Sequence, residues 1–214
     1  MTLKLALFAI FFVLASANQG LVLREKMNPV DTYQCFARSF YTLLATPVWT
    51  QGDGPNSYFT RGINYARTAR IYNHDAIIRT GDISDPETIC KETVNVLPGD
   101  FNGTVWVNLG FEFTSPVEDR MNYLDSLVRS CQQHGLKLGI FSDFSTWESV
   151  FGDRYASSSV VEALPLFYSN KDRWDNFKDY ESVAFGKWSA PTMKSSYGTE
   201  FILCSRMTEH IYYP

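Results

Sequence analysis

The sequence predicts an α/β fold in which short strands alternate with helices and a mostly parallel sheet closes, or nearly closes, into a barrel. Two observations support this class. At least five strand-like runs alternate with helical patterns, and no linker, repeat or low-complexity stretch interrupts them. The composition is globular, with 45% hydrophobic and 20% charged residues among 214, which excludes a disordered or collagen-like chain. The expected strands are Tyr41–Leu44, Ala76–Arg79, Thr104–Leu109, Leu136–Phe141 and Leu164–Tyr168, followed by short antiparallel C-terminal strands at Phe185–Trp188, Thr192–Ser195 and Ile211–Tyr213.

The first residues of the chain have the pattern of a secretory signal peptide. Lys4 precedes an uncharged apolar run, Leu5–Leu14, and Ala15-Ser16-Ala17 offers the small residues of a cleavage site. Such a run is too short to cross a bilayer, which takes about 20 residues. A buried N-terminal helix is the alternative interpretation. We expect residues 1–17 to be removed and residues 18–214 to form one secreted, extracellular domain without membrane association after cleavage.

Three of the expected helices begin with a polar capping residue, then a proline, then an acidic residue. The cap accepts a free backbone N–H, proline suits the first turn, and the acid interacts favourably with the positive end of the helix dipole. The three starts are Asn28-Pro29-Val30-Asp31, Asp85-Pro86-Glu87 and Ser115-Pro116-Val117-Glu118, and two further helices are expected over Ser57–Arg70 and directly after Asp143.

Four cysteines remain after the leader, and in a secreted chain they favour disulfide bonds. Of the three possible pairings we favour Cys90–Cys131, which joins two expected helices, and Cys35–Cys204, which would tie the ends of the chain. Because the spacing lacks the C-x-x-C pattern of a zinc site, no metal is expected. Asn102-Gly103-Thr104 is an N-glycosylation sequon, and Asn102 is therefore a candidate acceptor.

In an α/β barrel, functional side chains gather on the loops that leave the carboxyl ends of the strands. An acidic and aromatic rim at those positions suits a carbohydrate. For Asp143, which stands just before an expected helix, a helix-capping role is the favoured alternative. The net charge of −4, the absence of a Lys/Arg run longer than two, and the absence of phosphate-binding glycine motifs indicate no nucleic acid and no cofactor. The candidate positions are Asn108, Gly110, Glu112, Asp143 and Asp172.

Several stretches fit the motifs of one enzyme family. Residues 105–110, VWVNLG, are similar to a W-x-D-x-E strand, and Gly135–Trp147 is similar to H-G-x-x-x-G-I-Y-S-x-x-x-x-W. Pro165–Asp172 and Phe185–Ser195 are similar to P-L-W-Y-A…D and F-G-G-W-x-x-P-x-x-K-Q-Y. In this order the chain resembles the glycoside hydrolase family 25 lysozymes, in particular their nematode and protist branch, over about residues 20–214. The resemblance implies a modified TIM-like (β/α) barrel, secretion, and cleavage of peptidoglycan between N-acetylmuramic acid and N-acetylglucosamine in immunity or bacterial digestion.

The chain departs from this family at the residues that would perform the chemistry. The aspartate of the D-x-E pair aligns with Asn108, and the glutamate, the expected proton donor, aligns with Gly110. No aspartate stands near Leu21–Arg24, where the family has one, and Ser195 replaces the glutamine of K-Q-Y. Only Asp172 remains of the acidic set. Because loss of a general acid lowers a rate about 10²- to 10⁴-fold, we expect reduced or absent hydrolysis.

These substitutions leave three functions open. One is an active muramidase with a relocated acid, Glu112 acting with Asp172, although Glu112 would lie about 6.6 Å along a strand from Gly110. Another is a non-catalytic secreted factor that binds a protein. The leading hypothesis is a secreted lysozyme-like protein of innate immune or antibacterial defence whose catalysis is lost or weak. It would still bind peptidoglycan or another N-acetyl glycan through Trp106, Tyr168, Asp172 and Trp188.

Overall fold

The computed structural model describes residues 18–214 except 25–27, 197–199 and 203–204. The expected signal peptide, residues 1–17, lies outside the described residues, and so does Cys204 of the expected Cys35–Cys204 pair. Within the described part, no helix combines the length and the hydrophobicity needed to cross a bilayer.

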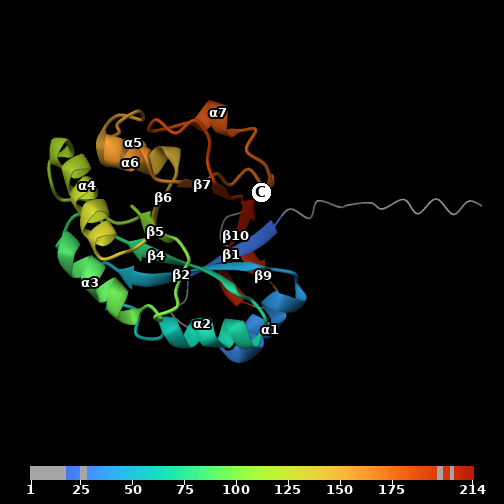
Figure 1. Ribbon diagram of the computed structural model, residues 1–214. Helices are drawn as coiled ribbons and strands as arrows, with labels where there is room; N and C mark the ends of the chain where they lie inside the picture. The colour runs from blue at the N-terminus through green and yellow to red at the C-terminus, as the bar shows by residue number, and fades with distance from the viewer. Residues whose placement is uncertain (1–17, 25–27, 197–199, 203–204) are drawn as a thin grey trace, which may run out of the picture.

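Eight strands close into a barrel, which confirms the predicted α/β barrel class (Figure 1). Neighbouring strands from the first to β8 run parallel, whereas β10 runs antiparallel to both β8 and β1 and so closes the ring. In order around the barrel the strands are β1 (Asn18–Leu23), β2 (Leu43–Thr50), β4 (Asn73–Arg79), β5 (Val105–Asn108), β6 (Leu138–Ser142), β7 (Leu166–Ser169), β8 (Met193–Ser195) and β10 (Ser205–Tyr213).

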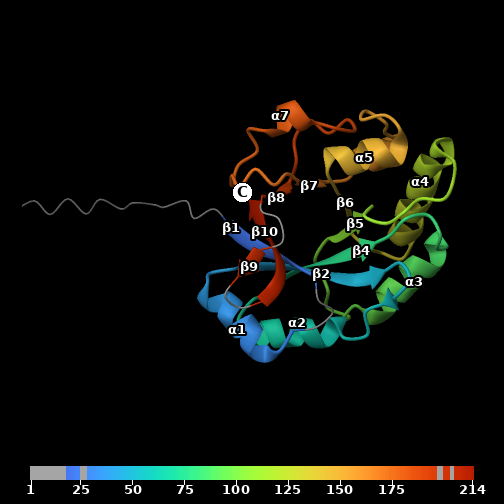
Figure 2. The same cartoon turned by 180° about the vertical axis from the view of Figure 1, so that it is seen from behind.

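Helices lie on the outside of this barrel in both views (Figures 1 and 2). Two short strands, β3 (Gly54–Pro55) and β9 (Glu200–Ile202), extend the sheet by pairing with β2 and β10. The helices are α1 (Val30–Arg38), α2 (Phe59–Thr68), α3 (Pro86–Val96), α4 (Val117–Gln133), α5 (Phe144–Phe151), α6 (Ser159–Glu162) and α7 (Tyr180–Val183).

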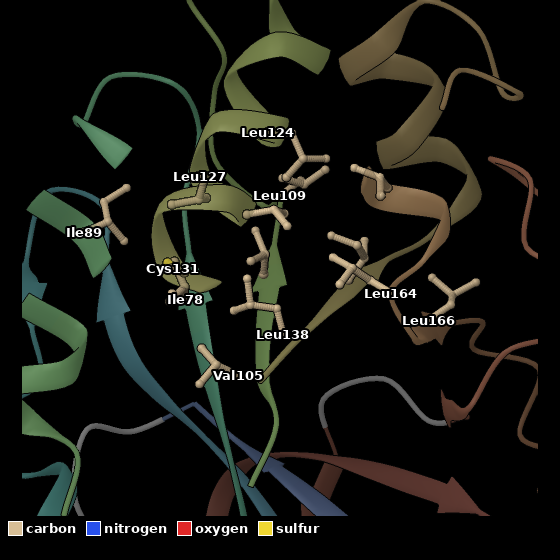
Figure 3. Packing of buried hydrophobic residues seen from close by; sticks show 14 of the residues in the cluster. Ile78, Ile89, Val105, Leu109, Leu124, Leu127, Cys131, Leu138, Leu164 and Leu166 are labelled. Carbon is tan, nitrogen blue, oxygen red and sulfur yellow. The ribbon is translucent and has the colours of Figure 1, made fainter. Parts of the chain in front are cut away.

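The core has two layers, because successive side chains of a strand point to opposite faces. One buried cluster draws residues from all eight barrel strands and from no helix, so it fills the barrel interior; it includes Ile77, Trp106 and Phe167. The second cluster lies between the barrel wall and the helices, where Leu124 and Leu127 of α4 face strand residues such as Leu138 (Figure 3).

A glycine inside the barrel makes room for its largest side chain. A Cβ at Gly139 of β6 would lie 2.3 Å from Cζ3 of the Trp106 indole. Any larger residue would therefore displace Trp106, and the glycine of the family-like motif has a packing role here.

Two of the predicted helix caps form as expected. Asp85 accepts the backbone N–H of Thr88, and Asp143 accepts that of Thr146. The capping roles predicted for Asn28 and Ser115 are wrong, because Pro29 and Pro116 themselves occupy the N-cap positions of α1 and α4. The backbone N–H of Ser115 instead donates to Asp82, which fixes the loop before α4 from outside the helix.

The predicted strand Phe185–Trp188 is wrong. This segment is a turn in which Gly186 adopts a left-handed conformation with φ of 56° and lies under the Trp188 ring. The strand predicted at Tyr41–Leu44 is only the start of β2, which continues through Pro47 to Thr50. A change of register between Pro47 and Trp49 accommodates the proline, which cannot donate a ladder hydrogen bond.

The predicted disulfide between Cys90 and Cys131 is confirmed, and it joins α3 to α4 across the outer core layer. Both cysteines are fully buried among apolar residues of that layer. The bond therefore links two helices that already pack together, and it closes a loop between positions separated by 41 residues.

Replacing both Cys90 and Cys131 with alanine should lower the free energy of unfolding by about 4 kcal/mol, because the unfolded chain regains the freedom of that loop. Urea unfolding followed by far-UV circular dichroism measures the change. Each single alanine variant serves as a comparison for lost packing. An unchanged urea midpoint in the double variant would contradict the prediction.

Candidate functional site

A cleft of about 390 Å³ opens at the carboxyl ends of the parallel strands. We call this cleft the barrel mouth. Functional sites of α/β barrels lie at this face, because the loops that follow the strands converge there. The cleft is lined by Arg24, Arg79, Asn108, Gly110, Phe111, Phe141, Ser142, Asp143, Thr146, Ser169, Lys171 and Glu209.

Asn108 and Gly110 both line the barrel mouth, so two of the sequence-predicted positions lie together in one cleft. The Asn108 side chain donates from Nδ2 to the carbonyl oxygen of Phe141 at 3.1 Å, which ties the end of β5 to β6. A Cβ at Gly110 would lie 2.8 Å from Oδ1 of Asn108, so a larger residue at 110 would force this amide to move. Neither residue carries an ionisable group.

Glu112 and Asp172, the proposed substitute acids, do not line the barrel mouth. The strand β5 ends at Asn108, so the alternation that placed Glu112 on the face of Asn108 stops before it reaches Glu112. Glu112 is exposed, and its backbone carbonyl packs against Gly81. Asp172 forms an ion pair with Lys194 at 2.7 Å and accepts the backbone N–H of Trp174. The structure does not bring these two carboxylates together in the cleft.

One carboxylate in the barrel mouth is Asp143, and its oxygens cap α5. They accept hydrogen bonds from the Ser145 hydroxyl at 2.5 Å, the Thr146 hydroxyl at 2.7 Å and the Thr146 backbone N–H at 2.9 Å. Burial raises the pKa of Asp143, but these hydrogen bonds outweigh burial and leave the pKa below its ordinary value. Asp143 is therefore a poor proton donor at neutral pH.

A second carboxylate of the barrel mouth, Glu209 of β10, was not among the predicted site residues. It is 8% exposed, and its Oε1 forms an ion pair with Arg24 while its Oε2 accepts a hydrogen bond from Ser195 at 3.0 Å. Glu209 shares strand parity with Ile211, which faces the barrel interior. The alternation that places Glu209 on the inward face was thus present in the sequence. It was missed because the predicted strand began only at Ile211.

The aromatic residues predicted to bind glycan are not gathered into one surface. Trp106 is 2% exposed inside the barrel, and its indole N–H donates to Asp75 at 2.7 Å. Tyr168 is buried in the outer layer, where its hydroxyl donates to Asp179. Trp188 is half-buried in the same layer and donates to the carbonyl of Leu164 at 2.8 Å. In this conformation only Trp188 of the three keeps part of its ring accessible.

A different tryptophan is presented to solvent near the barrel mouth. Trp174 is 68% exposed and lies in the loop after β7 that also carries Lys171 of the cleft. Asp172 accepts its backbone N–H, and the preceding Arg173 has a left-handed backbone with φ of 66°. This turn holds the Trp174 ring outward. Sequence reasoning missed it because the aromatic residues of strands were favoured over those of loops.

The Asn102 side chain lies on an exposed loop between α3 and β5, so the sequon remains a candidate for glycosylation. Within the described ranges, no group of three or more His, Cys, Asp or Glu side chains could hold a metal ion.

Solved structures with the same fold include family 25 glycoside hydrolases. The family GH25 lysozyme of Aspergillus fumigatus superposes with a TM-score of 0.70 at 9% identity, covering 93% of this chain and 94% of that chain. The bacterial lysozyme of Streptomyces coelicolor gives a TM-score of 0.71 at 9% identity, with 93% of each chain covered. The fold therefore defines a lysozyme-like α/β barrel of the GH25 class.

Sequence comparison identifies the family. The family model described as "Lysozyme-like protein 1" (Lys-1) matches residues 17–195, so the chain belongs to this GH25 lysozyme-like family. "Probable GH family 25 lysozyme 3" of Dictyostelium discoideum is 26% identical over 193 residues, which cover 87% of this chain but only 39% of that protein. "Lysozyme-like protein 5" of Caenorhabditis elegans is 19% identical over 194 residues, covering 85% of this chain and 84% of that protein.

Asp143→Ala should lower the free energy of unfolding by about 1 kcal/mol at pH 7, because α5 loses its cap. Asp143→Asn should lower the free energy of unfolding by less than Asp143→Ala does, since asparagine also caps helices. The pKa of Asp143 is depressed when the protein is folded, so its stabilisation is present above pH 3.8, the ordinary value, and is lost as pH falls through the folded value. Urea unfolding at pH 7 and at successively lower pH measures the difference between the parent and Asp143→Ala, and a difference that does not shrink as the pH falls would contradict the prediction.

Proposed function

We propose that this protein is a secreted lysozyme-like protein of antibacterial defence that binds peptidoglycan-type glycan at the barrel mouth and has little or no muramidase activity. One observation carries the proposal: Asn108 and Gly110 line the cleft at the positions that align with the acid pair of the resembled family. An amide and a residue without a side chain cannot deliver a proton to a glycosidic oxygen.

Glycoside hydrolysis usually needs one protonated carboxyl group and a second, ionised one on the other side of the scissile bond. The protonated group has a raised pKa in such enzymes. In the barrel mouth, Asp143 has a lowered pKa, and Glu209 is occupied by Arg24 and Ser195. These arrangements support the loss of the general acid.

The basic residues of the barrel mouth support the same conclusion. The transition state of glycoside hydrolysis resembles an oxocarbenium ion and carries developing positive charge. Arg24, Arg79 and Lys171 line the cleft together with the carboxylates Asp143 and Glu209, so the basic groups exceed the acidic ones by one and a sugar cation formed there would meet a net positive charge. The field of the cleft, as well as its missing proton donor, therefore opposes hydrolysis.

Support for glycan as the ligand comes from the family and from the shape of the mouth. Several relatives and solved neighbours with this fold are named as lysozymes or muramidases. The barrel has a cleft at its strand ends, and Trp174, in the loop that carries Lys171 of the cleft lining, offers an exposed aromatic face of the kind that suits a sugar ring. Secretion rests on the leader pattern of residues 1–17, and a defence role rests on the family.

A second candidate, a weak muramidase, is favoured by one observation. Two carboxylates, Asp143 and Glu209, line the same cleft. Hydrolysis by this pair would require Glu209 to leave Arg24 or Asp143 to release the α5 cap during the reaction.

The disulfide-intact protein should release no reducing ends from purified peptidoglycan above the level of a heat-inactivated control, because the general acid is missing. The same preparation should be retained saturably on insoluble peptidoglycan. Asp143→Asn, Glu209→Gln, Glu112→Gln and Asp172→Asn are assayed in parallel.

Robust hydrolysis that is abolished by Glu209→Gln or Asp143→Asn would establish the second candidate and overturn the proposed loss of catalysis. Abolition by Glu112→Gln would point to the relocated acid instead. The absence of both hydrolysis and retention would favour a secreted protein-binding factor.

Trp174→Ala should weaken retention on insoluble peptidoglycan about tenfold, because an exposed aromatic anchor beside the cleft is removed. Tyr72→Ala is the matched control, since Tyr72 is 67% exposed, close to the 68% of Trp174, but precedes β4 at the opposite end of the barrel. Equal retention of the two variants would contradict a role for Trp174.

A further inference from the structure

The sequence contains one N-glycosylation sequon, Asn102-Gly103-Thr104, in the loop that joins α3 to β5. Two of its three residues are explained by packing. A Cβ at Gly103 would lie 1.8 Å from the carbonyl oxygen of His74, so the close approach of the two backbones requires glycine. Thr104 is 7% exposed, and its backbone N–H donates to Asp75 at 2.8 Å. Packing therefore accounts for the second and third positions of the sequon.

The asparagine of the sequon is not explained in this way. The Asn102 side chain is exposed, and it makes no hydrogen bond among the residues that the structure describes. The turn that precedes it is held in place, because the backbone N–H of Phe101 donates to the carbonyl of Pro98 at 2.9 Å and Asp100 forms an ion pair with Arg67 at 3.0 Å. A fixed loop thus presents an unused amide to solvent, as a glycosylation site requires.

A groove of about 360 Å³ begins at this asparagine, and we call it the sequon groove. It lies where α3 and α4 end and β5 and β6 begin, so the four residues of β5 separate it from the barrel mouth. Its volume is near the lower end of the range for ligand pockets, about 300–1,000 Å³. Apolar side chains form most of its lining, which consists of Val94, Leu97, Pro98, Gly99, Phe101, Asn102, Gly103, Val105, His134, Gly135, Leu136 and Lys137.

The chemistry of the sequon groove suits a sugar ring. Phe101 is half-buried beside the attachment point, and its ring is held by an edge contact with Phe59 at a centroid distance of 6.1 Å. The C–H face of a sugar can pack on such a surface, while the exposed Lys137 can donate to an acetamido oxygen. Because a sugar bonded to Asn102 would be tethered at the edge of the groove, weak contacts are enough to hold it there.

We propose that Asn102 is an N-glycosylation site and that the first N-acetylglucosamine of its glycan packs in the sequon groove. The inference rests on the secretion part of the proposed function, because the sugar donor is a lipid diphosphate-linked oligosaccharide of the secretory pathway. In the transfer, Nδ2 of Asn102 bonds to C1 of the first sugar and releases one proton. The C1–O bond breaks, and the lipid diphosphate leaves.

The first test asks whether the amide is modified. The full chain with its own leader is expressed in cultured animal cells, and protein from the medium is analysed by intact mass and peptide mapping. It should carry one N-linked glycan, at Asn102, which peptide N-glycosidase removes. Asn102→Gln should carry none, whereas Thr104→Ser should still carry the glycan because the sequon accepts either hydroxyl residue.

The outcomes of this test separate the inference from the function on which it rests. Secreted protein without a glycan at Asn102 would overturn the inference and leave secretion standing. Protein that stays unmodified inside the cells would overturn secretion and the inference together.

The second test asks whether the first sugar lies in the groove. Protein made with glycan processing blocked is compared in three forms: intact, trimmed by an endoglycosidase to the first N-acetylglucosamine, and freed of the whole glycan. The trimmed form should unfold at the same temperature as the intact form, since the packed residue is still present. The third form and Asn102→Gln should unfold about 2 to 4 °C lower. Equal unfolding temperatures of the trimmed and the fully deglycosylated forms would overturn packing in the groove.

A substitution in the lining locates the effect. Val94→Ser should keep the glycan but reduce the temperature difference between the glycosylated and deglycosylated forms to about half, because an apolar contact of the sugar is lost. Val117→Ser is the matched control, since Val117 is 42% exposed, close to the 36% of Val94, but stands at the start of α4 outside the groove. Comparing each variant with its own deglycosylated form cancels the cost of the substitution itself. An undiminished difference in Val94→Ser would contradict the proposed position of the sugar.

Discussion

The alternation of side chains across a closed barrel wall is the constraint on which the rest of this structure depends. Once the ring closes, each strand has one set of residues that must fill the interior and another that must pack against helices. The last inward residue of a strand then lies at the mouth. Arg79, Asn108 and Ser169 reach one cleft for this reason, although they are far apart in the chain.

The seam that closes the barrel also determines the electrostatics of the mouth. The strand β10 is antiparallel to β1 and β8, and it is at this seam that Glu209 meets Arg24 from the other end of the chain. A partly buried ion pair of this kind offsets its own desolvation and adds little stability. Its main effect here is to occupy a carboxylate and a guanidinium, which leaves Arg79 as the unmatched inward cation. The mouth of this lysozyme-like barrel therefore has one more basic than acidic side chain in its lining.

The predicted elements with long, regular patterns agree with the structure. Among those that depended on short patterns, the strands Ala76–Arg79 and Thr192–Ser195 correspond to β4 and β8, whereas others are wrong. The α4 pattern of apolar residues at helical spacing and the apolar run of β6 were unambiguous. Phe185–Trp188 has the composition of a strand, but Gly186 turns the chain there. Glu112 was placed on the face of Asn108 by extending a strand that ends at Asn108 itself. Trp106 and Tyr168 were grouped because both are aromatic, yet the barrel wall separates them.

The sequence by itself determined the barrel class and the capping of α3 and α5 by Asp85 and Asp143, because these follow from local periodicity and local hydrogen bonding. It favoured the Cys90–Cys131 bond among three possible pairings, and the packing of α3 against α4 decided it. It also determined that positions 108 and 110 carry no acid. Only the tertiary structure decided which charges meet. Arg24 and Glu209 are 185 residues apart, and their contact depends on the register with which β10 joins β1. Register is a property of the closed sheet, since a shift of one residue would turn Glu209 out of the mouth and leave every local pattern unchanged.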